Sequence, residues 1–222
     1  MVGNDVVDLR DRDADPRRPR ERFDARVCRP EERVAIRGAA DPCRERWCHW
    51  AAKEAAYKLV KKRDPDTAFS PVRFRVDLVA EPDTWLERGA APTSRAGGVV
   101  YGDHRVALSI TCADGAVHAI ATWPDEGSAG LVHGFERLAA GPDAPLTPAV
   151  HSAAARRLAR ERLADRLGVA VTRLAIAKRG RIPELLLDRV PSGADLSLSH
   201  HGGLVAFACR LPAAHTPERL AS

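Results

Sequence analysis

The feature that most constrains the fold of this chain is an apolar hairpin pattern that occurs once in each half. Residues 108–121 and residues 196–208 have similar sequences, and one residue of slack aligns them. In the first copy Asp-Gly joins two alternating apolar runs, which is a strong β-hairpin signal. Each copy follows a short apolar stretch and a helix-like segment, so the chain resembles a duplicated α+β unit. Chance similarity of two apolar hairpins is the alternative.

The repeat predicts two similar lobes within the 222 residues. Residues 124–130, Pro-Asp-Glu-Gly-Ser-Ala-Gly, are typical of a linker. We therefore expect one lobe over residues 1–123 and a second over residues 124–222. Lobes that pack about a pseudo-twofold axis leave a cleft between them, and a chain that carries both lobes is expected to be a monomer.

The composition limits the cellular location and the kinds of site. No uncharged apolar run reaches the about 18–20 residues that a membrane span needs, and the N-terminus lacks the order of a signal peptide. We therefore expect a cytoplasmic protein with no membrane partner. The five cysteines are scattered and never spaced Cys-x-x-Cys, so we expect buried free thiols and neither a disulfide framework nor a thiolate zinc site.

The net charge of +5 favours anionic partners. Nucleic acid, a phosphorylated cofactor and an acidic protein all fit this charge. Only two Tyr and five Phe are available for stacking on bases, and no C2H2 finger or RNP motif is present. These observations argue against nucleic acid.

Residues 47–62 contain no Pro or Gly and are rich in Ala, which predicts a helix. Glu54 and Lys58 then lie on adjoining turns of one face, while Trp47 and Trp50 anchor the helix to the core. A surface salt bridge, worth a few tenths of a kcal/mol, is the common result of this spacing. The alternative is a carboxylate and an ammonium presented together to a phosphate and its metal ion.

Residues 3–9, Gly-Asn-Asp-Val-Val-Asp-Leu, predict a strand that two acids interrupt. In a strand Asp5 and Val7 share one face, and Asp8 lies on the other. Burying a carboxylate among valines costs free energy unless a charged group pairs with it. A turn capped by the Asp5 side chain is the alternative.

The remaining segments have ordinary signals. Pro30 and the acids after it favour a helix start. An Arg-rich segment from residue 150 to residue 167 predicts a helix that Gly168 ends. We expect loops or irregular connections at residues 10–22, 81–98 and 142–148, strands around residues 72–76, 99–101, 104–111, 116–123, 131–136, 174–176, 184–187, 195–199 and 204–211, and a turn at residues 200–203.

Three elements together resemble the signature of the 4'-phosphopantetheinyl transferases. That signature has a Gly-x-Asp strand, a Trp-x-x-Lys-Glu-Ala-x-x-Lys helix and a Ser-x-Ser-His hairpin, matched here by residues 3–5, 50–58 and 197–200. The resemblance covers most of residues 1–76 well and residues 150–211 more loosely. The lobe with the Gly-x-Asp strand comes first here and second in the familiar two-lobed members. This order is similar to that of the short holo-acyl-carrier-protein synthases.

The resemblance implies transfer of the phosphopantetheine arm of coenzyme A to a serine hydroxyl of an acidic apo carrier protein, with release of 3',5'-ADP. It implies Mg²⁺ held by Asp5 and Glu54, with Glu54 also accepting the serine proton and Lys58 stabilising the leaving phosphate. In two-lobed members a second strand acid stands where this chain has Val7. We therefore expect a metal shell of two carboxylates completed by water, with Asp8 supporting the core.

The resemblance also implies a coenzyme A site in the second lobe. Ser199 and His200 are expected to bind the coenzyme A phosphates, at a strand end before a Gly-Gly turn. Arg181 and Pro183 lie in Gly-Arg-Ile-Pro, which is similar to the Gly-Lys-Pro adenine-binding turn of the family with one residue extra. Three arginines of the second-lobe helix are candidates for the 3'-phosphate: Arg156, Arg157 and Arg160.

Two other functions stay open. Loss of the second strand acid also fits a non-catalytic module that binds coenzyme A or a nucleotide, and the basic charge also fits an α+β nucleic-acid-binding protein. The sequence names no pathway, because fatty acid, polyketide and non-ribosomal peptide synthases all use carrier proteins. A second, pseudo-symmetric cleft near Glu136 is expected to be degenerate, since no Lys-Glu-Ala helix accompanies that residue.

Overall fold

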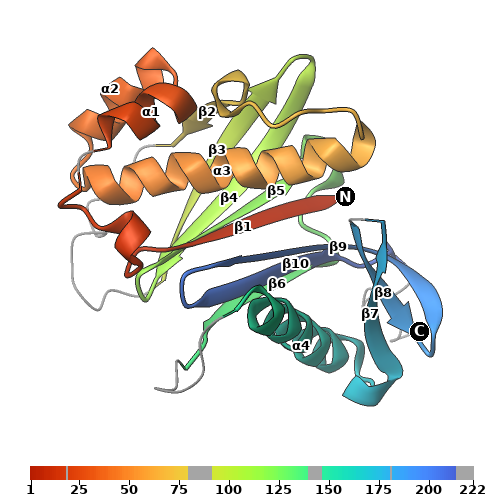
Figure 1. Cartoon of the computed structure of the whole chain (residues 1–222). Helices are drawn as coiled ribbons and strands as arrows, with labels where there is room; N and C mark the ends of the chain where they lie inside the picture. The colour runs from red at the N-terminus through yellow and green to blue at the C-terminus, as the bar shows by residue number, and fades with distance from the viewer. Residues whose placement is uncertain (19, 80–91, 140–146, 181, 214–222) are drawn as a thin grey trace.

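The computed structural model describes residues 1–18, 20–79, 92–139, 147–180 and 182–213 and contains two antiparallel sheets, each packed against one long helix (Figure 1). The strand orders are β1-β5-β4-β3-β2 and β6-β10-β9-β8-β7 within the described residues. The fold is therefore α+β, as predicted, and the chain passes from one sheet to the other between β5 and β6. The relation of the two halves by a pseudo-twofold axis stays a prediction.

The first sheet and its helices come from the first half of the chain. Asp41 accepts a hydrogen bond from the backbone N–H of Arg44 at 3.0 Å, and Pro42 follows at the first helical position of α3. The elements are β1 Val2–Asp8, η1 Arg12–Ala14, α1 Glu21–Val27, α2 Pro30–Gly38, α3 Pro42–Arg63, η2 Pro71–Arg73, β2 Arg75–Leu78, β3 Thr93–Tyr101, β4 His104–Ala113 and β5 Ala116–Thr122.

The second sheet is built around α4, which begins after the Thr147 cap and ends at Gly168, whose φ of 65° is the left-handed conformation expected of a helix end. Its elements are η4 Pro124–Glu126, β6 Leu131–Arg137, α4 Pro148–Leu167, η5 Val171–Arg173, β7 Leu174–Arg179, β8 Ile182–Leu187, β9 Val190–His201 and β10 Leu204–Arg210.

Strand β1 lies between helix α3 and the second sheet, so both of its faces are covered (Figure 1). On one face Gly3 touches the helix so closely that an added Cβ would lie 2.1 Å from the Ala55 carbonyl oxygen. On the other face Asn4 and Asp8 bind residues of β9 and of the β9–β10 turn. The alternation of side chains along β1 therefore sends Asp5 toward α3 and Asp8 toward the second sheet, as the strand pattern predicts.

Asp8 on β1 forms hydrogen bonds to the second sheet and so links the two sheets. Its carboxylate accepts two hydrogen bonds from the Arg137 guanidinium, at 2.7 and 2.8 Å, and one from the Gly203 backbone N–H at 2.9 Å. Burial raises the pKa of this carboxyl, but the hydrogen bonds from Arg137, Gly203 and the Arg10 backbone N–H, together with the Arg137 charge, outweigh burial and leave the pKa below its usual value. Asp8 thus has the core-supporting role that the sequence favours.

Several local expectations need correction. β3 begins at Thr93, inside the predicted irregular connection, because it pairs with β4 from Thr93 onward. Within β3, Gly97 approaches β2 so closely that a Cβ there would lie 2.6 Å from the Asp77 carbonyl oxygen. The predicted strand at residues 72–76 opens as η2, since Pro71 favours a helical turn, and only Arg75 begins the strand. Cross-strand pairing extends β9 through His201, so the turn follows that residue. The loop at residues 10–22 contains η1 and the start of α1.

Parts of two predicted connections, residues 80–91 and 140–146, lie outside the described residues. Within the described part of the chain, no helix is both long and apolar enough to cross a membrane. All five cysteines are free, and four of them are buried, as expected.

Candidate functional site

The strand β1 and the helix α3 bring Asp5 and Lys58 into direct contact. The Lys58 Nζ donates to Asp5 Oδ1 at 2.8 Å and to the Asn4 carbonyl oxygen at 3.0 Å. Lys58 therefore pairs with a carboxylate from another element. Its hydrogen bonds go to β1 and not to Glu54, so they do not form the surface Glu54–Lys58 salt bridge that was the alternative.

Glu54 lies in the same place and is largely buried. Burial is the largest influence on its carboxyl, and the nearby negative charge of Asp5 adds to it. Together they raise the pKa of Glu54 to about 7, although Lys58 acts in the opposite direction. Two carboxylates and one ammonium thus share a poorly solvated space at the edge of α3.

This arrangement fits a divalent metal ion with few protein ligands. Carboxylate oxygens are hard donors, and Mg²⁺ is usually held by one or two carboxylates together with waters and phosphate oxygens. Burial, and secondarily the negative charge of Asp5, raises the pKa of Glu54, and a cation bound between the two carboxylates would oppose both influences. Among the described residues no group of three or more His, Cys, Asp or Glu side chains forms a metal cluster. Val7 follows Asp5 on the same face and is fully buried in the core.

The second sheet contributes His200 near the end of β9. Its ring stacks on that of His151 from α4, with centroids 4.9 Å apart and planes 21° apart. His151 is buried, and its Nε2 lies 2.9 Å from the Gly202 carbonyl oxygen. Partial burial lowers the pKa of His200, as do the His151 ring and the Lys58 charge, whereas Asp5 raises it. His200 therefore lies within electrostatic reach of the Asp5 carboxylate and the Lys58 ammonium.

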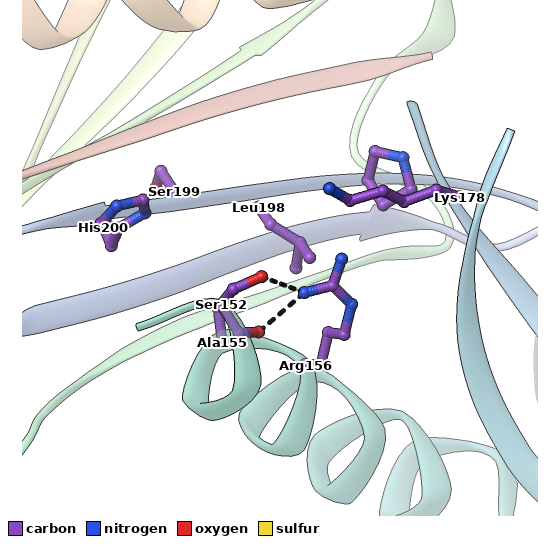
Figure 2. Close-up of a pocket in the computed structure, with 8 residues that line it drawn as sticks. Ser152, Ala155, Arg156, Lys178, Leu198, Ser199 and His200 are labelled. Atoms are coloured by element: carbon purple, nitrogen blue, oxygen red, sulfur yellow. Dashed lines mark hydrogen bonds between the residues drawn. The ribbon is translucent and has the colours of Figure 1, made fainter. Parts of the chain in front are cut away.

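A pocket of about 190 Å³ adjoins His200 between α4 and the second sheet (Figure 2). Two cations reach toward its middle, Arg156 from α4 and Lys178 from β7. The Arg156 Nη1 donates to the Ser152 carbonyl oxygen at 2.9 Å and to the Ser152 hydroxyl, which holds the guanidinium in place. Such a pair of cations beside a His suits phosphate groups. The lining residues are Ser152, Ala155, Arg156, Lys178, Pro183, Leu198, Ser199 and His200.

The structure brings only part of the predicted coenzyme A set to this pocket. Arg156 and Pro183 line it together with Ser199 and His200. Arg160, one turn further along α4, instead lies beside η5, where its Nη2 donates to the Val171 carbonyl oxygen at 3.2 Å. Arg157 forms ion pairs with Glu136 and Glu161. Arg181 lies outside the described residues.

The side chains of Ser199 and His200 lie on opposite faces of β9. The Ser199 side chain lies on the β1 side of β9, where its Oγ accepts a hydrogen bond from Asn4 Nδ2 at 3.0 Å, while His200 faces α4 (Figure 2). Alternation along the strand separates the two neighbours. Lys178 and His151 were not predicted. No motif marks either residue, because their proximity to His200 arises from the packing of α4 on the sheet and from the pairing of β7 through β8 with β9.

Asp5, Glu54 and Lys58 all lie in a part of the chain that matches a known protein family. Residues 1–109 match the family model described as 4'-phosphopantetheinyl transferase superfamily. The segment of residues 1–109 belongs to that superfamily. A search of curated proteins and a search of solved structures gave no match.

In this 4'-phosphopantetheinyl transferase superfamily segment, Lys53 has a structural role that the sequence reasoning missed. Its Nζ is fully buried and donates to both Glu32 carboxylate oxygens, at 2.9 and 2.8 Å, and to the Phe74 carbonyl oxygen at 2.6 Å. Burial lowers the pKa of Lys53, and the paired Glu32 acts in the opposite direction. The pair fixes α3 to α2 and so orients the helix that carries Glu54. The paired acids at residues 31–32 were the available signal.

Proposed function

We propose that this chain transfers the 4'-phosphopantetheine arm of coenzyme A to a serine hydroxyl of an apo carrier protein and releases 3',5'-ADP, in a reaction that requires Mg²⁺. One observation supports this function most strongly. A superfamily segment presents Asp5, Glu54 and Lys58 together, within electrostatic reach of His200, which borders a cation-lined pocket.

Asp5 and Glu54 are the residues that would hold Mg²⁺. When bound, this ion neutralises negative charge on a pyrophosphate as one of its P–O bonds breaks. The two carboxylates come from different elements, β1 and α3, and the close Gly3–Ala55 contact sets the separation between those elements.

The pocket of the second lobe supplies charge for the nucleotide end of coenzyme A. Arg156, Lys178 and His200 surround a space that suits phosphate groups, and Pro183 offers an apolar surface at its border. Arg156 is held by Ser152, so little side-chain entropy is lost when it binds an anion.

The transfer joins the serine oxygen of the carrier to the phosphorus that bears pantetheine. The bond from that phosphorus to the bridging oxygen breaks, and the oxygen leaves with 3',5'-ADP. Glu54 accepts the serine proton as the new bond forms. Within the described residues Lys58 uses two of its three N–H groups on Asp5 and the Asn4 carbonyl, so the third is available to stabilise charge on the leaving phosphate.

The proposed partner is an acidic carrier protein in the cytoplasm, because a net charge of +5 favours an anionic protein surface. We further propose that a metal-binding lobe, residues 1–123, and a coenzyme A lobe, residues 124–222, act together within one monomeric chain. Both sides of the proposed site come from this chain, which is consistent with that state.

The test is loading of a panel of purified apo carriers with coenzyme A, with Mg²⁺ or with EDTA, followed by mass spectrometry of the carriers. We expect a phosphopantetheine adduct only with Mg²⁺. Asp5→Asn should abolish the adduct, whereas Glu31→Gln, which alters an exposed carboxylate on α2, should leave it unchanged. Normal adduct formation in EDTA or in Asp5→Asn would remove the proposed metal site.

A non-catalytic coenzyme A-binding module is the second candidate, and the buried Val7 in place of an acid favours it. It predicts coenzyme A binding without transfer to any carrier. A nucleic-acid-binding protein predicts instead a complex that weakens steeply with salt and survives Glu54→Ala.

A further inference from the structure

His151 lies in the first turn of α4 and packs against the end of β9. Its backbone N–H donates to the Thr147 carbonyl oxygen at 3.0 Å, and the residue is 8% exposed. Its Nε2 lies 2.9 Å from the carbonyl oxygen of Gly202, in the turn after β9. A carbonyl oxygen only accepts hydrogen bonds, so this Nε2 carries a proton and donates it. Burial and this hydrogen bond together fix the His151 ring.

The fixed ring supports the exposed side chain of His200. The two rings stack with centroids 4.9 Å apart and planes 21° apart. Among the described residues no hydrogen bond or ion pair holds the His200 side chain. An exposed side chain without such a bond samples several rotamers, and a stacked aromatic neighbour restricts them. The contact with His151 therefore limits where the His200 ring can lie.

The same turn of α4 holds a second side chain of the pocket. Ser152 follows His151, and its carbonyl oxygen accepts a hydrogen bond from Arg156 Nη1 at 2.9 Å. Arg156 and His200 both border the pocket of about 190 Å³ (Figure 2). Phosphate oxygens accept hydrogen bonds from guanidinium and imidazole N–H groups. Groups that are in place before a ligand arrives lose less entropy when it binds.

Resting on the function proposed above, we propose that His151 is a positioning residue for coenzyme A: its ring, fixed by Gly202, holds the His200 ring at the border of the pocket, where His200 binds a phosphate group. His151 itself is buried and touches no substrate. It acts only through His200, from the helix turn that also holds Arg156 through Ser152.

The test is titration calorimetry of coenzyme A into the full chain, with Mg²⁺ and without any carrier protein. His151→Leu removes both the ring and the hydrogen bond to Gly202, whereas His151→Phe removes the hydrogen bond and keeps a buried ring that can stack. We expect His151→Leu to weaken binding about fivefold, the cost of ordering one side chain on binding, and His151→Phe to weaken it less than about twofold. In a His200→Ala background, His151→Leu should have no further effect.

A control for lost stability comes from the same helix. Leu163→Ala opens a cavity in the second core, away from the pocket, so it should lower the midpoint of thermal unfolding and leave affinity within about twofold. Wild-type affinity in His151→Leu would overturn the inference. Equal losses in the Leu and Phe variants would also overturn it, because they would assign the effect to the lost hydrogen bond, and so would losses that multiply with His200→Ala. If His151→Leu does not fold, His151→Met replaces it, since methionine also lacks a ring.

This inference and the proposed function fail separately, because calorimetry without a carrier does not depend on transfer. Coenzyme A binding with these differences but without transfer to any carrier contradicts the proposed function alone. Normal transfer by the wild type, with unchanged coenzyme A affinity in His151→Leu, contradicts this inference alone.

Discussion

His118 makes a specific prediction about stability at low pH. Its side chain is 1% exposed, and burial, His133 from β6 and the Lys58 charge from α3 together lower its pKa to about 3. In the unfolded chain a histidine protonates near pH 6.5. Between these values the unfolded state binds one more proton than the folded state, so the free energy of unfolding must fall as the pH falls.

The size of this effect follows from the two pKa values. Between pH 7 and pH 5 the unfolded histidine gains about 2 kcal/mol of proton-binding free energy, while the folded His118 gains almost none. His118→Gln keeps an acceptor for Asn4 and removes the titration. We expect this variant to lose about 2 kcal/mol less stability than the wild type over this pH range.

The measurement is urea unfolding followed by tryptophan fluorescence at pH 7 and pH 5. For each protein the unfolding free energy at pH 5 is subtracted from that at pH 7, and the two differences are compared. Carboxylates with lowered pKa values, such as Glu45 at about 2, contribute mainly below this pH range. Glu54, whose pKa is raised to about 7, titrates within the range in both proteins and cancels in the comparison. His133 and His200, whose pKa values are also lowered, keep their contributions in both proteins and cancel in the comparison. Equal losses in the two proteins would mean that His118 is protonated in the folded state.

Three further predictions concern the site and its supports. Glu54→Gln should lower the rate of transfer by at least about a thousandfold. In EDTA its midpoint of thermal unfolding should equal or exceed that of the wild type, since the variant removes one of two adjacent carboxylates, and a lower midpoint would contradict this. Lys53→Met should cost about 3–5 kcal/mol of unfolding free energy in urea, with part recovered by adding Glu32→Gln; a neutral Lys53→Met refutes the buried pair. Arg137→Ala should cost about 2–3 kcal/mol by leaving Asp8 buried with a weaker set of partners, and Asp8→Asn should then add little.

Much of the fold could be predicted from the sequence because its signals are local. Ala-rich residues without Pro or Gly predicted the core of α3, and Asp114-Gly115, with φ of 51° and 73°, formed the expected hairpin turn. β3 could not be predicted so fully. Its Gly97 has low strand propensity, and only pairing with neighbouring strands makes a close approach favourable there.

The sequence by itself determined which residues share a face, because strand and helix periods follow from backbone geometry alone. That is why Asp5 and Asp8 were separated correctly, and why Glu54 and Lys58 were placed on one edge of a helix. Tertiary structure alone decided the partners: Lys58 with Asp5, Lys53 with Glu32, Asn4 with Ser199, and Lys178 with the pocket beside His200. Such contacts join residues far apart in the chain, and they depend on how α3, β1 and β9 pack, which no local pattern encodes.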